Sequence, residues 1–588
     1  MGKMQDTRQP SWEEVAKEHA TKQHNNIPAE WRLPQEKLDA LSGVGTADEG
    51  RLIQLQAARK SGLLSDRELD ITENHTARDL LPKLAARELT SVEVTVAFCK
   101  RAALAQQLTS CLTEIFFNEA IEKAKEADQY LEKHGEVRGP LHGLPISMKV
   151  RQTPSGNVHG AQSPGANGNT CIGLIRSRRT PRLRWVCGVP ETAGPQGEST
   201  LVKLLQEAGA ILYCKTNVPQ TMMVNCGLRK QHLRPHPQPP QHQAQRRRFH
   251  RRRGRPPRLP RFPAGRGHRH RRLHPYSLRV LRHLRLQADG GPRPLRRPKL
   301  VPLPRNHLPG IVPAAGPMAN TLADLKVFMD IVIAQRKPWN YDVTAIDIPW
   351  RAVEKTEKTK KLVIGIAPED EEFQLHPPVK RTIDEAAKKL EAAGHTVVRL
   401  PADPSRSMAL GGRLAFSFYG LEGHPTNEQM VAEFGEPLIK SLAVGVHPFA
   451  LSPPPLSPEW SVAKKVAEWN RCKEEYTDSW RRAWLDNGLD VVLAPGAIST
   501  AVPHDSFGVP VYTAAWNVTN YPACIIPYGK SSKTLDPNPM KGHAAFDADY
   551  TPELQDGAPC SVQVITPTFK DEECLHAATI IDEVLNGA

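Results

Sequence analysis

The chain of 588 residues lacks the marks of a secreted or membrane-bound protein. Its ten cysteines form no Cys-x-x-Cys pair and no regular spacing, so we expect neither a zinc site nor a disulfide framework. No apolar run is long enough to span a membrane, and the N-terminal sequence MGKMQDTRQPSWEEV has no apolar signal core. We therefore expect a cytoplasmic protein with no membrane partner.

Acidic residues are scarce in only one part of the chain. Between Arg229 and Leu308 there are 24 lysines and arginines against one acid, Asp289, and this segment produces the net charge of +15. The rest of the chain holds 54 basic and 62 acidic residues. Because the excess charge is confined to one segment, the chain resembles an acidic to neutral enzyme with a basic insert, and we expect no nucleic-acid partner.

One pattern recurs along the chain: an amphipathic helix, a glycine that ends it, and an apolar strand. Helix 201–208 with Gly209 and helix 381–393 with Gly394 are examples. Strands are expected at 210–214, 362–366, 396–400, 491–494, 523–527 and 561–565. The repetition predicts an α/β fold, with a sheet covered by helices on both faces.

A capping box at Thr90–Glu93 predicts a helix that begins there, since the threonine can cap the helix and the glutamate can reach back to it. Its apolar face carries Cys99, which is therefore a core residue rather than a nucleophile. A second helix is expected at about 121–134, and the polar residues 10–75 are expected to form helices around the outside.

Residues 139–149, GPLHGLPISMK, combine a Gly-Pro turn with an apolar run that ends on a lysine. A lysine carried inward by a buried strand loses its charge more readily, and a neutral amine can act as a base. A lysine that reaches the surface from the strand end is the alternative. This block resembles the first signature block of the amidase signature family of serine hydrolases, whose catalytic lysine falls at Lys149.

Three further blocks, ELTSVEVTVAFCKRAALAQQLTSC, KPWNYDVTAIDIPWR and SWEEVAKEH…NNIPAEWRL, resemble fungal acetamidase-type members. The resemblance covers residues 10–149, 186–229 and 308–585. It implies the amidase-signature fold, a large twisted mixed β-sheet with helices on both faces. The domain would span 76–588, and residues 1–75 would form an N-terminal helical wrap.

The resemblance also implies the chemistry. Family members hydrolyse amides with a Ser–cis-Ser–Lys triad, without a metal or organic cofactor. For this chain the implied substrate is a small monocarboxylic acid amide such as acetamide, which yields a carboxylate and ammonia. The implied partner is this small molecule, and a homodimer is an option that the sequence leaves open.

Both serine blocks of the family are missing. If one nucleotide is dropped, codons for residues 268–278 can encode Thr-Asp-Ile-Gly-Gly-Ser-Ile-Arg-Ile-Pro-Ser, the block with the nucleophile. The same shift lets 245–256 encode Ser-Ala-Gly-Gly-Ser-Thr-Gly-Gly-Glu-Gly-Ala-Leu, the block with the cis-serine, and lets 230–242 encode another family block. One shift that recovers three blocks in order indicates out-of-frame translation of 230–308, rather than a natural basic insertion.

Residues 150–185 also interrupt the family pattern and show no strand or helix signal. Val150 is encoded by a codon that begins with GT, as introns do, so a retained intron is our interpretation of this segment. No shifted reading of it yields a family block.

The chain as written keeps only Lys149 of the implied triad. Phe249 and Leu273 stand where the two serines would be encoded, and neither side chain can replace an attacking hydroxyl. Ser147 and Ser277 lie nearby but outside the motif. We therefore expect an inactive product whose basic segment is exposed and poorly ordered. The alternatives are a catalytically dead amidase-like scaffold and a basic nucleic-acid-binding protein.

The reading-frame interpretation predicts that a one-nucleotide insertion or deletion in the genomic or transcript sequence across codons 145–312 restores both serine blocks. Sequencing of both templates checks this. If no single-base change restores the two blocks, the interpretation of 230–308 is wrong.

Overall fold

The computed structural model describes residues 11–43, 56–149, 200–217, 316–341, 345–353, 361–419, 459–502, 508–542 and 548–587, and a few single positions between them. It also describes the backbone of three short strands at 158–160, 175–177 and 276–279. Among these residues, no helix is both long enough and apolar enough to cross a membrane.

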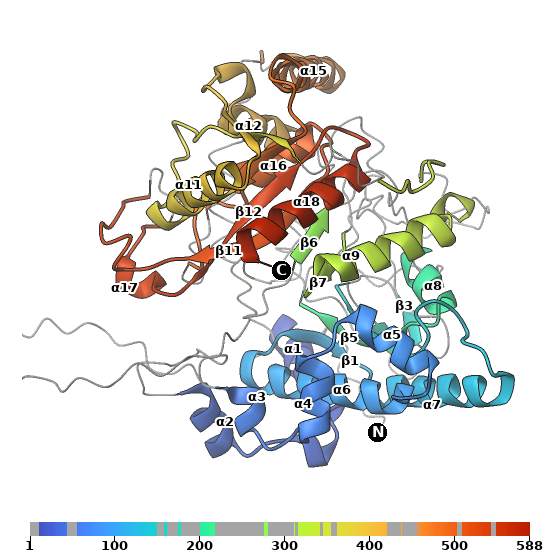
Figure 1. Cartoon of the computed structure of the whole chain (residues 1–588). Helices are drawn as coiled ribbons and strands as arrows, with labels where there is room; N and C mark the ends of the chain where they lie inside the picture. Colours follow the sequence, from blue (N-terminus) through green and yellow to red (C-terminus); the bar gives the residue numbers. More distant parts are fainter. Residues whose placement is uncertain are drawn as a thin grey trace, which may run out of the picture.

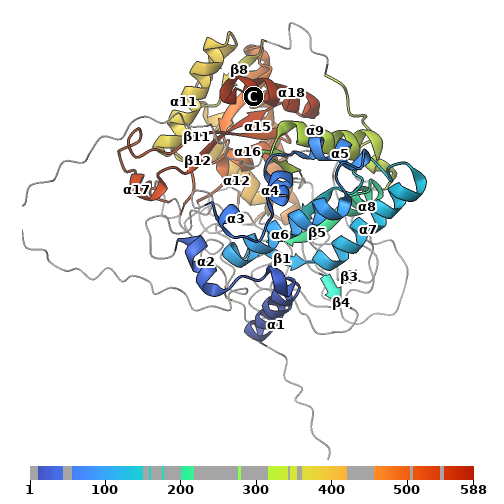
Figure 2. The ribbon, with the colours of Figure 1, turned by 60° about the horizontal axis from the view of Figure 1, so that its bottom comes forward.

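A three-stranded sheet forms the core of the smaller part of the molecule, in the lower half of Figure 1. The central strand is β5 (Ile211–Thr216), with β1 (Leu112–Ile115) antiparallel on one side and β2 (Pro145–Met148) parallel on the other. Helices α6 (Ser91–Thr109) and α7 (Phe117–His134) lie alongside this sheet (Figure 2). The capping box predicted at the start of α6 is present.

Helices also make up the described N-terminal region. They are α1 (Trp12–Asn25), α2 (Gln35–Ser42), α3 (Ala57–Lys60), α4 (Asp66–Glu73) and α5 (Ala77–Ala85). Helix α1 holds the edge strand β1 through side chains rather than through a further strand. The Gln23 side chain accepts a hydrogen bond from the backbone N–H of Ile115, and Asn26 donates one to the carbonyl of Ile115. This edge of the sheet is therefore covered.

A seven-stranded sheet forms the larger part, in the upper half of Figure 1, with strand order β7-β6-β11-β12-β10-β8-β9. It is mixed, because β8, β9 and β10 run parallel while β11 and β12 are antiparallel to their neighbours. Its strands are β6 (Tyr276–Arg279), β7 (Met318–Ala319), β8 (Val363–Ile366), β9 (Thr396–Arg399), β10 (Val491–Pro495), β11 (Ala523–Lys530) and β12 (Pro559–Ile565).

Helices cover both faces of this sheet, as the repeating pattern predicts. In β10, Val491 and Leu493 pack in one core cluster with α11 (Pro377–Ala392) and α18 (Asp571–Asn586). The intervening Val492 packs in a second cluster with helices on the opposite face. Those helices are α12 (Met408–Tyr419), α15 (Val462–Asp486) and α16 (Val511–Val518). The α/β architecture with a mixed sheet is confirmed.

Helices α8 (Thr200–Glu207) and α9 (Leu322–Met329) connect the two sheets through one continuous apolar cluster. Met148 from the small sheet and Ile526 from the large sheet both belong to it. In addition, the backbone N–H of Arg78 donates to the carboxylate of Asp324 on α9. Within the described part of the chain, no strand joins β2 to β7, so the two sheets share a core without sharing a ladder.

The two interrupting segments contain short strands that we did not expect. Strand β6, from the basic segment, pairs antiparallel with β11 and β7. In the segment 150–185, β3 (Val158–Gly160) pairs antiparallel with β4 (Ile175–Ser177). The expectation of no regular structure is wrong at these positions, because strand pairing uses backbone groups that any sequence supplies. The other residues of both segments lie outside the described part of the chain.

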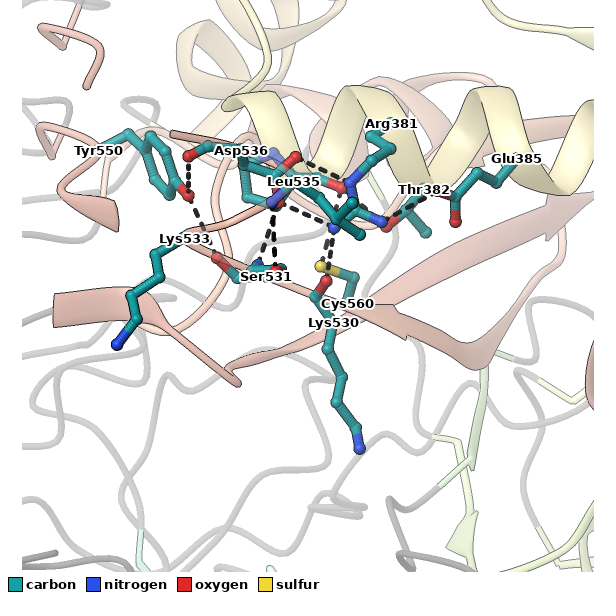
Figure 3. Close-up of polar contacts among 12 residues, drawn as sticks. Arg381, Thr382, Glu385, Lys530, Ser531, Lys533, Leu535, Asp536, Tyr550 and Cys560 are labelled. Atoms are coloured by element: carbon teal, nitrogen blue, oxygen red, sulfur yellow. Dashed lines mark hydrogen bonds and ion pairs between the residues drawn. The ribbon is translucent and has the colours of Figure 1, made fainter. Parts of the chain in front are cut away.

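Arg381 on α11 fastens the segment after β11, which includes α17 (Pro552–Gln555), to the large sheet (Figure 3). Its Nε and Nη2 donate to the two carboxylate oxygens of Asp536, both at 2.8 Å, and Nη2 also donates to the carbonyl of Lys530 at 2.6 Å. The Tyr550 hydroxyl donates to the carbonyl of Asp536 at 3.0 Å. Asp536 is only 4% exposed, and Arg381 is the cation that its buried carboxylate contacts.

We predict that Arg381→Ala lowers the free energy of unfolding by about 3 kcal/mol, because it leaves the Asp536 carboxylate buried without its cation. Denaturant unfolding measures the loss. Arg399→Ala is the control: it breaks an exposed ion pair with Asp384 and should cost less than about 1 kcal/mol. Equal losses in the two variants would contradict the role of Arg381.

Candidate active site

Backbone contacts hold the lysine block in place. The N–H of Leu141 donates to the carbonyl of Ala208 at 2.8 Å, and the N–H of Gly143 donates to the carbonyl of Gly209 at 3.0 Å. In return, the N–H of Ile211 donates to the carbonyl of Leu144 at 2.9 Å. The turn that precedes β2 is thus joined to the turn between α8 and β5 before the two strands begin to pair.

Two glycines allow the turns to pack this closely, Gly209 against the other turn and Gly143 against α6. Gly209 has φ +94°, and a Cβ on it would lie 2.9 Å from the backbone of His142. Gly143 has φ +72°, and a Cβ there would lie 2.2 Å from the Ser91 hydroxyl oxygen. Both positions combine the left-handed backbone conformation with a close approach. A side chain at Gly209 would push the two turns apart, and one at Gly143 would push its turn away from the start of α6.

His142, within the turn, is buried and hydrogen-bonded to the backbone. Its ring is 2% exposed, and its Nδ1 accepts a hydrogen bond from the N–H of Arg138, so Nε2 carries the proton. Burial lowers the pKa of His142, an effect that the nearby Asp128 carboxylate partly offsets. Asp128 in turn accepts hydrogen bonds from the N–H groups of Ser91 and Val92 at the start of α6. His142 is therefore a neutral structural residue of the turn, and Asp128 joins α7 to the start of α6.

Lys149 directly follows β2 and is partly buried. The strand itself is less buried than we expected, because Pro145 and Met148 are buried but Ser147 is exposed. Ser147 is exposed because β2 is an edge strand among the described residues, with β5 as its one partner. Phe249 and Leu273, where the serines would be encoded, lie outside the described residues. Lys149 is therefore the one member of the implied triad whose position is described.

The family model for amidases matches residues 93–152 and 299–575, more than half of the chain. It leaves 153–298 unmatched. The chain belongs to the amidase family. It is 32% identical to an amidase of Gibberella moniliformis and 32% identical to an acetamidase of Emericella nidulans. Each alignment covers 98% of this chain and 99% of the relative.

Solved structures agree on the fold. The chain resembles a fatty acid amide hydrolase with a TM-score of 0.69 at 21% identity, over 97% of this chain and 94% of that one. It resembles a crystal structure of an amidase with a TM-score of 0.53 at 15% identity, over 87% of this chain and all of the other. The amidase-signature fold implied by the sequence is confirmed, and the chain is by family an amide hydrolase.

The small sheet of this amidase contains a deeply buried lysine, Lys215, that was not predicted from the sequence. It lies on β5 and is 2% exposed, and its Nζ is 3.6 Å from the Glu114 carboxylate on β1. Burial lowers the pKa of Lys215, and the charge of Glu114 counteracts this shift. A signal was present in the sequence, since a lysine and a glutamate each interrupt an apolar run, in ILYCKT and LTEIFF.

Cys99 on α6 is fully buried, and burial raises the pKa of its thiol. A protonated, inaccessible thiol cannot act as a nucleophile. The prediction that Cys99 is a core residue is confirmed.

We predict that Gly209→Ala destabilises this amidase by more than about 2 kcal/mol, because it adds a backbone clash with His142 to the strain of a left-handed alanine. Thermal or denaturant unfolding measures the effect. Gly135→Ala is the matched control: Gly135 has φ +71° but no atom within 4 Å of the added Cβ. It should cost about 1 kcal/mol. Equal costs would show that the contact with His142 is not tight.

Proposed function

We propose that this chain derives from an amidase that hydrolyses a small monocarboxylic acid amide, such as acetamide, to a carboxylate and ammonia. The relatives named acetamidase align over nearly its full length and support the substrate class. The position of Lys149 directly after β2, held by the glycine turns, supports its role as the base. The chain as written lacks the serines that this base would serve, and we infer that it is inactive.

In the intact enzyme, Lys149 would accept a proton from the nucleophilic serine through the cis-serine. The serine oxygen would bond to the amide carbon, and the C–N bond would break as the relayed proton goes to the leaving nitrogen. Water would then hydrolyse the acyl-enzyme to free acid. Backbone N–H groups of the Ile-Gly-Gly-Ser turn would stabilise the oxyanion.

Two observations support an interrupted coding sequence. The family match stops at residue 152 and resumes at residue 299, an interval that contains both serine positions. Apart from the β3–β4 pair, the described strands also form two separate sheets, and β2 and β7 are edge strands of these sheets. Loss of strands encoded between residues 150 and 308 would leave such a division. Because the described cysteines are free thiols, we also infer a reducing, cytoplasmic location.

Restoring the reading frame should restore activity. With the shifted segment corrected, and any confirmed intron removed, the protein should release ammonia from acetamide. Lys149→Ala in that protein should reduce kcat/KM by about a thousandfold or more, since it removes the general base. An ammonia-release assay measures both.

Lys203→Ala, which removes a half-exposed lysine on α8, is the control and should keep full activity. If the corrected protein folds and Lys149→Ala leaves its activity intact, Lys149 is not the base. If the folded, corrected protein cleaves no small amide, the proposed substrate class is wrong.

A further inference from the structure

The turns fix where β2 and β5 begin to pair, but the apolar side chains of the strands do little to set the register beyond that point. The apolar residues of β5 enter core clusters on both faces, with Ile211 and Cys214 in one and Leu212 against the other. In a strand with one buried and one exposed face, the alternation of apolar and polar residues sets the register, because a slip of one residue would turn the apolar side chains toward solvent. A strand that is apolar on both faces lacks this constraint.

Glu114 and Lys215 are the only charged residues in β1, β2 and β5. They are direct partners in the β1–β5 ladder and are 3% and 2% exposed. Their charged atoms lie 3.6 Å apart. A slip of β5 along β1 would separate them and leave the Lys215 ammonium buried without its counter-ion, which is strongly unfavourable.

We propose that the Glu114–Lys215 ion pair sets the register of the small sheet and thereby positions Lys149. This inference rests on the proposed function, in which Lys149 is the base. Buried ionic groups often contribute little net stability, and specifying a register is their best-attested role. The pair is thus a positioning element and not part of the reacting machinery.

The connection to Lys149 runs through the other edge of β5. Met148, the residue before Lys149, pairs with Lys215 in the β2–β5 ladder. The end of β2 therefore lies directly beside the residue that forms the ion pair. The β2–β5 ladder has an irregularity between Ile146 and Ser147, and the β1–β5 ladder has one between Leu112 and Glu114. Short strands with such irregularities could also pair in a register shifted by one residue. The ion pair favours the observed register over the shifted ones.

The test compares two double variants of the full-length chain as it is written. Glu114→Leu with Lys215→Met replaces the ion pair by apolar side chains. Glu114→Lys with Lys215→Glu exchanges the charges and is the matched control, because it keeps an attraction in the same register. Thermal unfolding reports stability, and acetylation by N-hydroxysuccinimidyl acetate, followed by peptide mass spectrometry, reports the exposure of individual lysines.

We expect the apolar variant to unfold at the same or a higher temperature than the unaltered chain. Its Lys149 should nevertheless be acetylated about tenfold faster, because a strand without a fixed register opens locally more often. Lys326, which is exposed on α9, serves as the internal reference and should not change. The charge-exchanged variant should match the unaltered chain at both lysines. If it does not fold, Glu114→Gln, which keeps an oxygen acceptor for Lys215, takes its place with the same expectation.

An unchanged Lys149 rate in the folded apolar variant would overturn the proposal, since the pair would then be structural only. A parallel rise at Lys149 and Lys326 would also overturn it, because it would indicate general loosening. The readout needs no catalysis, so failure here is distinct from failure of the frame-restored enzyme to cleave amides.

Discussion

The close backbone contact between residues 139–144 and 208–211 is the constraint on which the small sheet depends. It brings together two turns that are far apart in the sequence, and only a residue without a side chain at Gly209 allows it. From this contact β2 and β5 leave as a parallel pair, and β1 adds to the other edge of β5. These turns fix where β2 begins, and Lys149 follows its last residue directly.

Much of the fold was predictable because local signals and tertiary packing agree. The capping box at Thr90, the strands around 491–494 and 523–527, and the glycine that ends α8 are all found near the predicted residues. Helix starts were less accurate. Helix α7 begins at Phe117 rather than near residue 121, and α11 begins at Pro377. A proline in the first turn of a helix is easily taken for a residue outside it.

The parts of the site that were not predicted depend on neighbours in space. The exposure of Ser147 follows from the edge position of β2, which the sequence of β2 does not encode. The pairing of Glu114 with Lys215 joins residues about a hundred positions apart, through a ladder register that no local pattern specifies. A charged residue inside an apolar run is a usable signal in retrospect, because such a charge must find a partner when it is buried.

We infer that this amidase keeps its lysine strand but that its serine blocks are read out of frame. Labelling with a fluorophosphonate, which bonds covalently to an activated serine oxygen, tests it most directly when the chain as written and the frame-restored chain are compared by intact mass. The account predicts one added group on the restored chain, at the serine of its Asp-Ile-Gly-Gly-Ser block, and none on the chain as written. Stoichiometric labelling of a single serine in the chain as written would contradict it.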